Sequence, residues 1–378
     1  MHAYYLSHAL AKKGHDITVF CGGVEKSIHE TEENGTKVVR LPFRLVDLPP
    51  NFLWFQLQNF RRLSRVLGDF DVIHTEQVSG TSIAFLKGIL NRPWVVSFHS
   101  SWSKTYLSMV SESIRGPNLG DFRTYVLGFP VFHLATSSEL RFSDMRVTCS
   151  RTLAQELSSD YSTDIDRFHV ISNGVDVESL ESIGRESLPK VKKGPTLFFC
   201  GRLFAVKGIH FLLQAVSILT RKYPRIKLKI FGRGPLERDI RHYVTRTGLQ
   251  GNVEIRGFVP YETLISELKE SDVAVYPSLY EAQSIAMLEA MACSRPVVAF
   301  ALPFAKEVIT DGETGVLARS QDSRDLAVRI SHLLDNDHLR RKIGRSAKQY
   351  VAVYHNWGKI ADQYARAYRD AMKNVGQN

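Results

Sequence analysis

Two cationic side chains, Arg202 and Lys207, stand between a Phe-rich stretch at 196–201 and an apolar stretch that begins at Ile209. The first stretch is typical of a buried strand, and the second has the apolar spacing of a helix, with Gly208 just before it. Free amides at a helix start attract anions, and Arg and Lys add direct charge. The segment therefore indicates a phosphate site, although such cations also occur at the start of ordinary surface helices.

Two carboxylates, Glu281 and Glu289, follow another predicted strand at 272–278. Ser284 is a favourable N-cap, so Glu281 is expected in a loop and Glu289 in the second turn of a helix. Both can then face the same cleft. Ala, Met and Leu surround Glu289 in the sequence, and a carboxylate in an apolar setting needs a partner. A sugar or ribose diol would serve, and so would an arginine.

Three other strand ends carry weaker signals. Gly232 ends the stretch 226–232 in a glycine turn, which by itself indicates only a loop. Phe258 and Val259 follow the stretch 252–257, where the aromatic ring could stack on a base or cap the core. His99 ends the stretch 92–99, and a lone histidine is more often structural than functional.

Strand-like and helical stretches alternate along most of the chain. Val, Ile and Phe enrich the strands, which predicts α/β domains with parallel sheets covered on both faces. Two series separated by a polar stretch predict two doubly wound domains, at 1–185 and 194–355, followed by a helix at 356–378. Ligands bind at the carboxyl ends of strands in such sheets. The predicted strands lie at 16–21, 37–42, 70–76, 92–99, 145–150 and 167–173, and then at 196–201, 226–232, 252–257, 272–278, 295–300 and 314–318.

The net charge of +10 lies in the second half of the chain. Residues 1–190 hold 20 Lys/Arg and 21 Asp/Glu, a balance of −1, whereas residues 191–378 hold 29 and 18, a balance of +11. A basic half suggests a polyanionic ligand such as nucleic acid, a membrane or a phosphate compound. No apolar run reaches the ~18 residues of a membrane span, and no signal peptide is expected. The four cysteines lack metal-ligand spacing and indicate reduced thiols in a cytoplasmic protein.

Taken together, these segments resemble the retaining family 4 glycosyltransferases, whose GT-B architecture has two facing Rossmann-like domains. Glu281 and Glu289 form the most specific part of the match. The resemblance spans nearly the whole chain in the family's order, through “VISNGVD”, “GRLFAVKG”, “FGRGP”, “RGFVP”, “EAQSIAMLEAMA” with “RPVVA”, and “EVITDGETGVLA”.

The resemblance implies a role for each cation and carboxylate. Arg202 and Lys207 would hold the diphosphate of a UDP- or GDP-sugar and stabilise it as the leaving group. Glu289 would bond the ribose, and Glu281 would contact the donor sugar. The sugar would pass to the acceptor with retention of configuration. The two cations would replace a metal, so neither a metal nor a further cofactor is implied.

Other positions would complete the site by the same resemblance. His99 would line the acceptor side near the anomeric carbon and take part in catalysis. The acceptor would be a carbohydrate or a lipid-linked sugar in cell-surface glycan or glycolipid synthesis. The remaining donor contacts would be Gly232, Phe258, Val259, Ser284 and Ile285.

Three other functions compete with this hypothesis. A nucleotide-sugar 2-epimerase has the same architecture but does not resemble the cation and two-carboxylate segments taken together. A non-catalytic nucleotide-sugar-binding or partner subunit would keep the pocket without turnover. Nucleic-acid binding would use the basic half as a surface stripe, and cations at strand ends fit a diphosphate better.

The stretch 51–67 sorts into two faces if it is helical. Its apolar face, which includes Leu57, is expected in the core. Trp54, Arg61 and Arg65 share the opposite face, which suggests a peripheral contact with anionic lipid at the inner face of the membrane or with a lipid-linked phosphate. The alternative is an ordinary solvated face.

The first dozen residues are predicted to form a helix, which Gly14 ends before the strand at 16–21. In the family a strand and a Gly-rich loop precede this helix, and that strand lies between those expected at 17–21 and 72–76. We therefore expect the sequence to be a shortened form of a chain with roughly 15–30 further residues, poorly active and less stable. The strands at 17–21 and 72–76 should then be separated, or collapsed onto each other.

Overall fold

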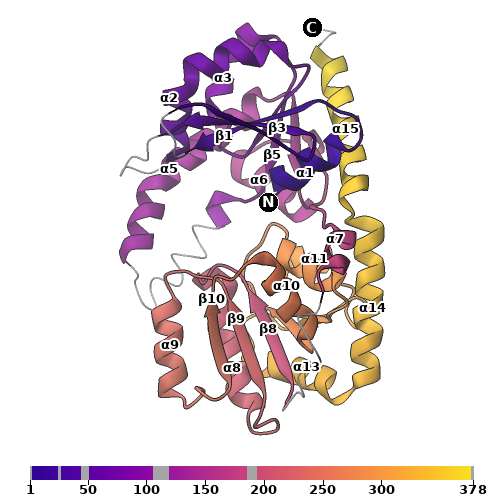
Figure 1. The fold of residues 1–378 in the computed structure, drawn as a ribbon. Coiled ribbons are helices and arrows are strands. Elements are labelled where there is room, and N and C mark those ends of the chain that lie inside the picture. The colour runs from indigo at the N-terminus through magenta and orange to yellow at the C-terminus, as the bar shows by residue number, and fades with distance from the viewer. Residues whose placement is uncertain (1, 24–26, 44–50, 105–118, 185–193, 376–378) are drawn as a thin grey trace. The chain divides into compact units, whose positions relative to one another are not determined.

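The computed structural model describes residues 2–23, 27–43, 51–104, 119–184 and 194–375 (Figure 1). These residues form two compact units. The N-terminal unit comprises the described parts of 1–106, 119–174 and 357–378, and the C-terminal unit comprises those of 175–356. The division at 174/175 precedes the predicted linker, because the short helix α7 (Val177–Ser182) packs into the core of the C-terminal unit.

The C-terminal unit contains one parallel sheet of six strands, in the order β10-β9-β8-β11-β12-β13. Its strands are apolar on both faces: Leu197 and Phe199 enter one core and Phe198 enters the other. This burial explains the continuous apolar runs of the sequence. The strands are β8 (Thr196–Cys200), β9 (Lys227–Phe231), β10 (Val253–Gly257), β11 (Val273–Tyr276), β12 (Val297–Phe300) and β13 (Val316–Ala318).

Helices cover both faces of this sheet (Figure 1). The helix α8 begins directly after the loop that follows β8, and α11 begins after the loop that follows β11. The elements are the 3₁₀ turn η3 (Ala205–Lys207), α8 (Ile209–Leu219), α9 (Glu237–Arg246), α10 (Tyr261–Glu270), α11 (Ile285–Ala292), α12 (Pro303–Lys306), α13 (Ser323–Asp335) and α14 (Asp337–Tyr354).

The N-terminal unit contains two sheets. The first has the order β1-β3-β2, with β1 (Ile17–Gly23) parallel to β3 (Thr36–Pro42) and β2 (His29–Glu33) antiparallel to β3. The second is parallel, in the order β4 (Ile73–Glu76), β5 (Trp94–Phe98), β6 (Met145–Thr148) and β7 (Phe168–Val170). Sequence analysis missed β2, because its residues HETEE are polar and show no apolar alternation.

The strands β1 and β4 lie in different sheets. Among the residues that the structure describes, β1 pairs only with β3 and β4 pairs only with β5. No described strand therefore occupies the position between them, which is the position that the sequence pattern leaves without a strand.

The N-terminal unit holds six described α-helices and two 3₁₀ turns. Its core joins both ends of the chain: Leu6 and Leu10 of α1 pack with Ile360 and Tyr364 of α15, beside Val95 of β5. The elements are α1 (His2–Ala11), α2 (Asn51–Val66), η1 (Leu67–Asp69), α3 (Thr81–Leu90), α5 (Leu119–Phe142), α6 (Arg151–Tyr161), η2 (Ile165–Arg167) and α15 (Trp357–Val375).

The helix α2 is present as predicted, but the expectation for its apolar face is wrong in part. Leu57 is 65% exposed, whereas the polar Gln56 and Asn59 are buried. Gln56 donates to Val78 O in the loop after β4 at 2.9 Å and accepts from Ser82 N in the first turn of α3 at 2.5 Å. Asn59 donates to Pro42 O at 3.1 Å. These backbone groups need partners in the interior, so hydrogen bonding overrides the apolar pattern here. Among the described residues, no helix is both long and apolar enough to cross a bilayer.

Candidate active site

Four loops of the C-terminal unit meet at one edge of its sheet. Because β8 to β11 are parallel and adjacent in the order β10-β9-β8-β11, their carboxyl ends lie side by side. The loop after β8 carries Arg202 and Lys207, and the loop after β11 carries Glu281. Gly232 and Phe258 follow β9 and β10. The residues predicted to bind the donor therefore lie in loops at a single edge of this sheet.

Lys207 and Glu281 form an ion pair across two of these loops. Lys207 Nζ lies 2.5 Å from Glu281 Oε1, and the two side chains are 22% and 16% exposed. Ser278 also donates to Glu281 Oε1, at 3.1 Å. The pair fixes the ammonium group where an anionic ligand can approach it.

Backbone contacts hold the two loops together. Gly208 has φ +63°, and a Cβ built on it would lie 1.9 Å from Pro277 O in the loop after β11. Leu279 N donates to Val206 O at 2.8 Å in the same region. Only glycine fits this close approach, so Gly208 sets the position of Lys207 relative to Glu281.

The turn after β9 packs equally closely against the end of β8. Gly232 has φ +123°, and a Cβ there would lie 2.0 Å from Gly201 O. Its N–H donates to Gly257 O at 2.8 Å, at the end of β10. Gly232 thus joins three neighbouring strand ends, which explains the glycine in a turn that the sequence marked only as a loop.

Glu289 is buried in α11, with 5% of its surface exposed. Its partner is Tyr261, whose hydroxyl donates to Glu289 Oε1 at 2.7 Å. Burial raises the pKa of Glu289 to about 7, although the hydrogen bond from Tyr261 lowers it. The anticipated partner was a diol or an arginine, and sequence analysis missed Tyr261. Its position after the strand end at 252–257, beside Phe258 and Val259, was the available signal.

The pKa of the Cys200 thiol, at the end of β8, is shifted by burial and by the charged groups around it. Burial raises the pKa of Cys200 to about 12, and Glu289 and Glu281 raise it further, while Lys207 lowers it. Both carboxylates and the ammonium group therefore lie near the same strand end. Opposite charges are concentrated beside an apolar sheet edge, where electrostatic interactions are strong.

The other predicted donor residues differ in exposure. Arg202 is exposed, and its guanidinium group lies 4.4 Å from the centre of the Phe204 ring. Phe258 is 78% exposed and so does not cap the core, whereas Val259 packs against the hydrophobic core. Ser284 caps α11, which begins at Ile285: its hydroxyl accepts from Met287 N at 3.4 Å. The first turn of α11 therefore presents its free amides at this edge.

In the N-terminal unit, His99 follows β5 and forms an ion pair with Glu76 at the end of β4. Glu76 also accepts a hydrogen bond from His2 at the start of α1: the distance from His2 Nδ1 to Glu76 Oε1 is 2.9 Å. Burial lowers the pKa of His99, but Glu76 outweighs this and raises it to about 10. Burial would raise the pKa of Glu76, yet His99 and His2 hold it well below its usual range.

The loop between β4 and α3 is held in a strained shape next to this cluster. Val78 has φ +64°, which a β-branched residue rarely adopts. The buried carboxylate of Glu139 accepts from Val78 N at 2.8 Å and from Gly80 N at 2.9 Å. Burial raises the pKa of Glu139 to about 8, although these two hydrogen bonds lower it. Glu139 therefore fixes the loop that follows Glu76.

His2 and Glu76 are residues that sequence analysis did not single out. Together with His99 they offer two imidazole nitrogens and a carboxylate oxygen, all within 4.8 Å of one another. Among the described residues, this is the group of three whose geometry suits a metal ion. Glu76 could have been found because it ends β4, the strand that pairs with β5, which precedes His99. Nothing in the sequence indicated His2.

Two family models match this chain. “Glycosyltransferase Family 4” matches residues 1–179, and “Glycosyl transferases group 1” matches residues 182–350. The chain belongs to glycosyltransferase family 4. It carries the predicted donor cations and carboxylates on the second of its two Rossmann-like domains.

Known proteins resemble this family 4 glycosyltransferase over nearly its whole length. Glycogen synthase of Mycobacterium tuberculosis is 26% identical and covers 100% of this chain and 92% of its own. Phosphatidyl-myo-inositol mannosyltransferase of Mycolicibacterium smegmatis is 27% identical, over 97% of this chain and 88% of its own.

Solved structures share its GT-B fold. Sucrose-phosphate synthase of Thermosynechococcus elongatus superposes with a TM-score of 0.82 at 23% identity, covering 98% of this chain and 93% of its own. Anabaena HepE, solved in complex with UDP, gives a TM-score of 0.73 at 19% identity, with 97% and 96% covered.

Proposed function

We propose that this glycosyltransferase moves a sugar from a UDP- or GDP-sugar to an acceptor hydroxyl, with retention of configuration. The observation that supports this most directly is the Lys207–Glu281 pair, held beside Arg202 and Glu289 at one sheet edge. A diphosphate needs cations and free amides, and a sugar or ribose needs carboxylate acceptors. Similarity to HepE, which was solved with UDP, favours a uridine nucleotide.

In this proposal each group has one task. The ammonium group of Lys207 and the guanidinium group of Arg202 bind the diphosphate and stabilise the charge that develops as it leaves. The bond from C1 of the sugar to the diphosphate oxygen breaks, and a bond from C1 to the acceptor oxygen forms on the same face. The proton of the acceptor hydroxyl passes to an oxygen of the departing diphosphate. Preorganised charge of this kind lowers the barrier without a metal cofactor.

Carboxylates and loop backbone position the donor. Glu281 accepts from hydroxyls of the sugar, near the amides of Ser284 and Ile285. Glu289 accepts from the ribose, which displaces or shares the hydroxyl of Tyr261.

Further groups hold the base and the acceptor. Backbone around Gly232, Phe258 and Val259 holds the base, and the exposed ring of Phe258 is free to stack on it. His99 lines the acceptor side.

Nucleotide release from a panel of UDP- and GDP-sugars tests the proposal. We expect release from at least one donor, with the product keeping the anomeric configuration of the donor by NMR. Arg202→Ala and Glu289→Ala should each reduce the rate strongly while the far-UV circular dichroism stays unchanged. The assignment of the site would be wrong if both variants kept wild-type rates of hydrolysis and transfer.

The acceptor is proposed to be a carbohydrate or a lipid-linked sugar reached at a membrane surface. Arg61 and Arg65 are exposed on α2, and Leu57 is exposed between them and the half-buried Trp54. The helix α3 packs against α2 and carries Phe85, which is 78% exposed. Apolar side chains flanked by arginines suit anionic lipid. Similarity to a phosphatidyl-myo-inositol mannosyltransferase supports a lipid acceptor.

Co-sedimentation with vesicles tests the membrane contact. We expect binding to anionic vesicles that falls in the Arg61→Ser/Arg65→Ser variant. Arg167→Ser, which removes an exposed cation elsewhere in the N-terminal unit, should bind as the wild type does. Equal binding to neutral and anionic vesicles, unaffected by the double substitution, would rule the contact out.

A further inference from the structure

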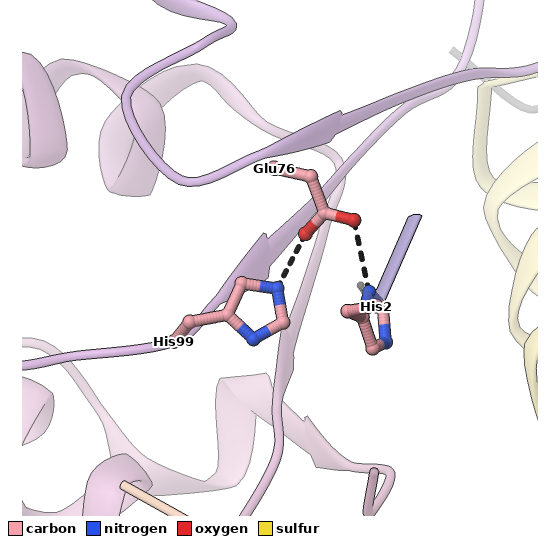
Figure 2. Close-up of side chains that lie close together, drawn as sticks. All are labelled: His2, Glu76 and His99. Carbon is pink, nitrogen blue, oxygen red and sulfur yellow. Dashed lines mark hydrogen bonds and ion pairs between the residues drawn. The ribbon is translucent and has the colours of Figure 1, made fainter. Parts of the chain in front are cut away.

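Three side chains from three separate segments converge at the sheet edge of the N-terminal unit. Figure 2 shows His2 and His99 on either side of Glu76, each directed at one oxygen of its carboxylate. His2 begins α1, Glu76 ends β4, and His99 follows β5. The His2 and His99 rings lie 4.6 Å apart between centroids. The three potential ligands thus come together only through the tertiary fold.

The set of donor atoms suits a transition metal. Neutral imidazole nitrogen and carboxylate oxygen are common ligands of Zn²⁺, with metal–ligand distances of about 2.0–2.2 Å. Two atoms bound to one ion at about 2.1 Å cannot be more than ~4.2 Å apart. In tetrahedral coordination two such ligands lie about 3.4 Å apart. The ligand atoms of this cluster lie within 4.8 Å of one another, so the widest separation would have to close by up to about 1.4 Å, which side-chain rotation can supply.

A chain of hydrogen bonds orients the His2 ring from behind. His2 Nε2 lies 3.2 Å from Tyr364 OH, which lies 2.9 Å from Ser97 Oγ. Ser97 Oγ lies 2.8 Å from His74 Nε2, and His74 Nδ1 lies 2.7 Å from Tyr368 OH. In one of its two possible directions this chain accepts a hydrogen bond from His2 Nε2–H. In that tautomer Nδ1 carries the lone pair and can bind a metal ion instead of donating to Glu76.

Metal-binding histidines usually have such a partner on the second ring nitrogen. His99 has a comparable neighbour, because the thiol of Cys149 lies within hydrogen-bonding reach of its ring. Both imidazoles therefore have a second polar neighbour besides the carboxylate. The support is buried: Tyr364 is 1% exposed and Ser97 is 1% exposed.

We propose that His2, Glu76 and His99 bind one divalent transition-metal ion, of which Zn²⁺ is the best match. The ion links the start of α1 to the ends of β4 and β5 and leaves a coordination position open to water or another ligand. His99 is also the residue proposed above to line the acceptor side, and zinc binding is measured independently of transferase activity.

Zinc titration of the full chain, with a competing chromophoric chelator, tests this site. We expect one tight Zn²⁺ per chain, with the affinity reduced more than ~100-fold in Glu76→Gln and in His99→Gln. Tyr364→Phe removes only the supporting hydroxyl and should weaken binding by about 10-fold. His169→Gln is the matched control, because His169 is an exposed histidine of the same unit; its affinity should equal that of the wild type.

X-ray absorption of the zinc-loaded wild type gives a second reading that needs no substitution. We expect two imidazole ligands and at least one further oxygen ligand around the ion. Zn²⁺ should also raise the Tm of the wild type and leave that of Glu76→Gln unchanged. The proposal is overturned if the wild type binds zinc no more tightly than the His99→Gln variant, or if the spectrum shows fewer than two histidines.

Discussion

Replacing Lys207 by methionine removes its charge and keeps most of its volume. In the structure this ammonium group is paired with Glu281 and is 22% exposed, so it is partly shielded from water. A bound diphosphate would share it with the carboxylate. Lys207→Met should therefore impair turnover far more than it impairs folding.

The size of the effect follows from the surroundings of the pair. Unit charges about 4 Å apart interact by about 4 kcal/mol at an effective dielectric constant of 20. Removing one preorganised group that stabilises developing charge costs about 2.7–4 kcal/mol, or 10²–10³ in kcat. Glu281 already takes up part of the Lys207 charge, so we expect the lower end of this range, a loss of about 100-fold in kcat.

The assay measures nucleoside diphosphate release from the best donor, together with the Tm of each variant. Lys222→Met is a matched control, because Lys222 also pairs with a carboxylate, Asp335, at 2.5 Å. Those two side chains are 57% and 46% exposed, and the pair lies beyond the other end of α8. An exposed pair contributes little, so this variant should keep wild-type kcat. The reasoning is refuted if Lys207→Met retains kcat within threefold of Lys222→Met.

Three further predictions concern stability and can be measured by chemical or thermal unfolding. Gly208→Ala should reduce stability and donor binding far more than the control Gly248→Ala does. Both glycines have positive φ, but only at Gly208 would the new Cβ collide with another atom, Pro277 O. Equal losses in the two variants would mean that this close approach is unimportant. Glu289 keeps its proton up to about pH 7 in the fold but loses it near pH 4.5 when unfolded, so its burial costs stability as the pH rises through this window. Glu289→Gln should therefore gain stability relative to the wild type between pH 4.5 and 7, by up to about 3 kcal/mol, and a pH-independent difference would contradict the raised pKa. Glu139→Ala leaves two buried N–H groups unpaired and should cost about 2–4 kcal/mol, whereas the exposed Asp71→Ala should cost little.

Local patterns in the sequence determined the elements and the residues of the donor edge. Buried parallel strands need continuous apolar runs, so the strands of the six-stranded sheet were all visible, as were Arg202, Lys207, Glu281 and Glu289 at their carboxyl ends. Because parallel strands end at a common edge, chain order alone was enough to bring these residues to one region. The polar edge strand β2 was missed, since its pairing with β3 leaves no apolar period in the sequence.

Only the tertiary structure decided which side chains meet. The pairing of Lys207 with Glu281 joins residues 74 positions apart, and it depends on the close approach of Gly208 to the loop after β11. Tyr261 as the partner of Glu289, and the convergence of His2 with Glu76 and His99, likewise depend on strand order. Tertiary structure also explains why Gln56 is buried and Leu57 is exposed. Backbone groups of the neighbouring loop and of α3 need hydrogen-bond partners, and Gln56 supplies them against the apolar pattern of its helix. A sequence pattern records what a residue prefers on its own element, whereas its partner is set by backbone geometry elsewhere in the chain.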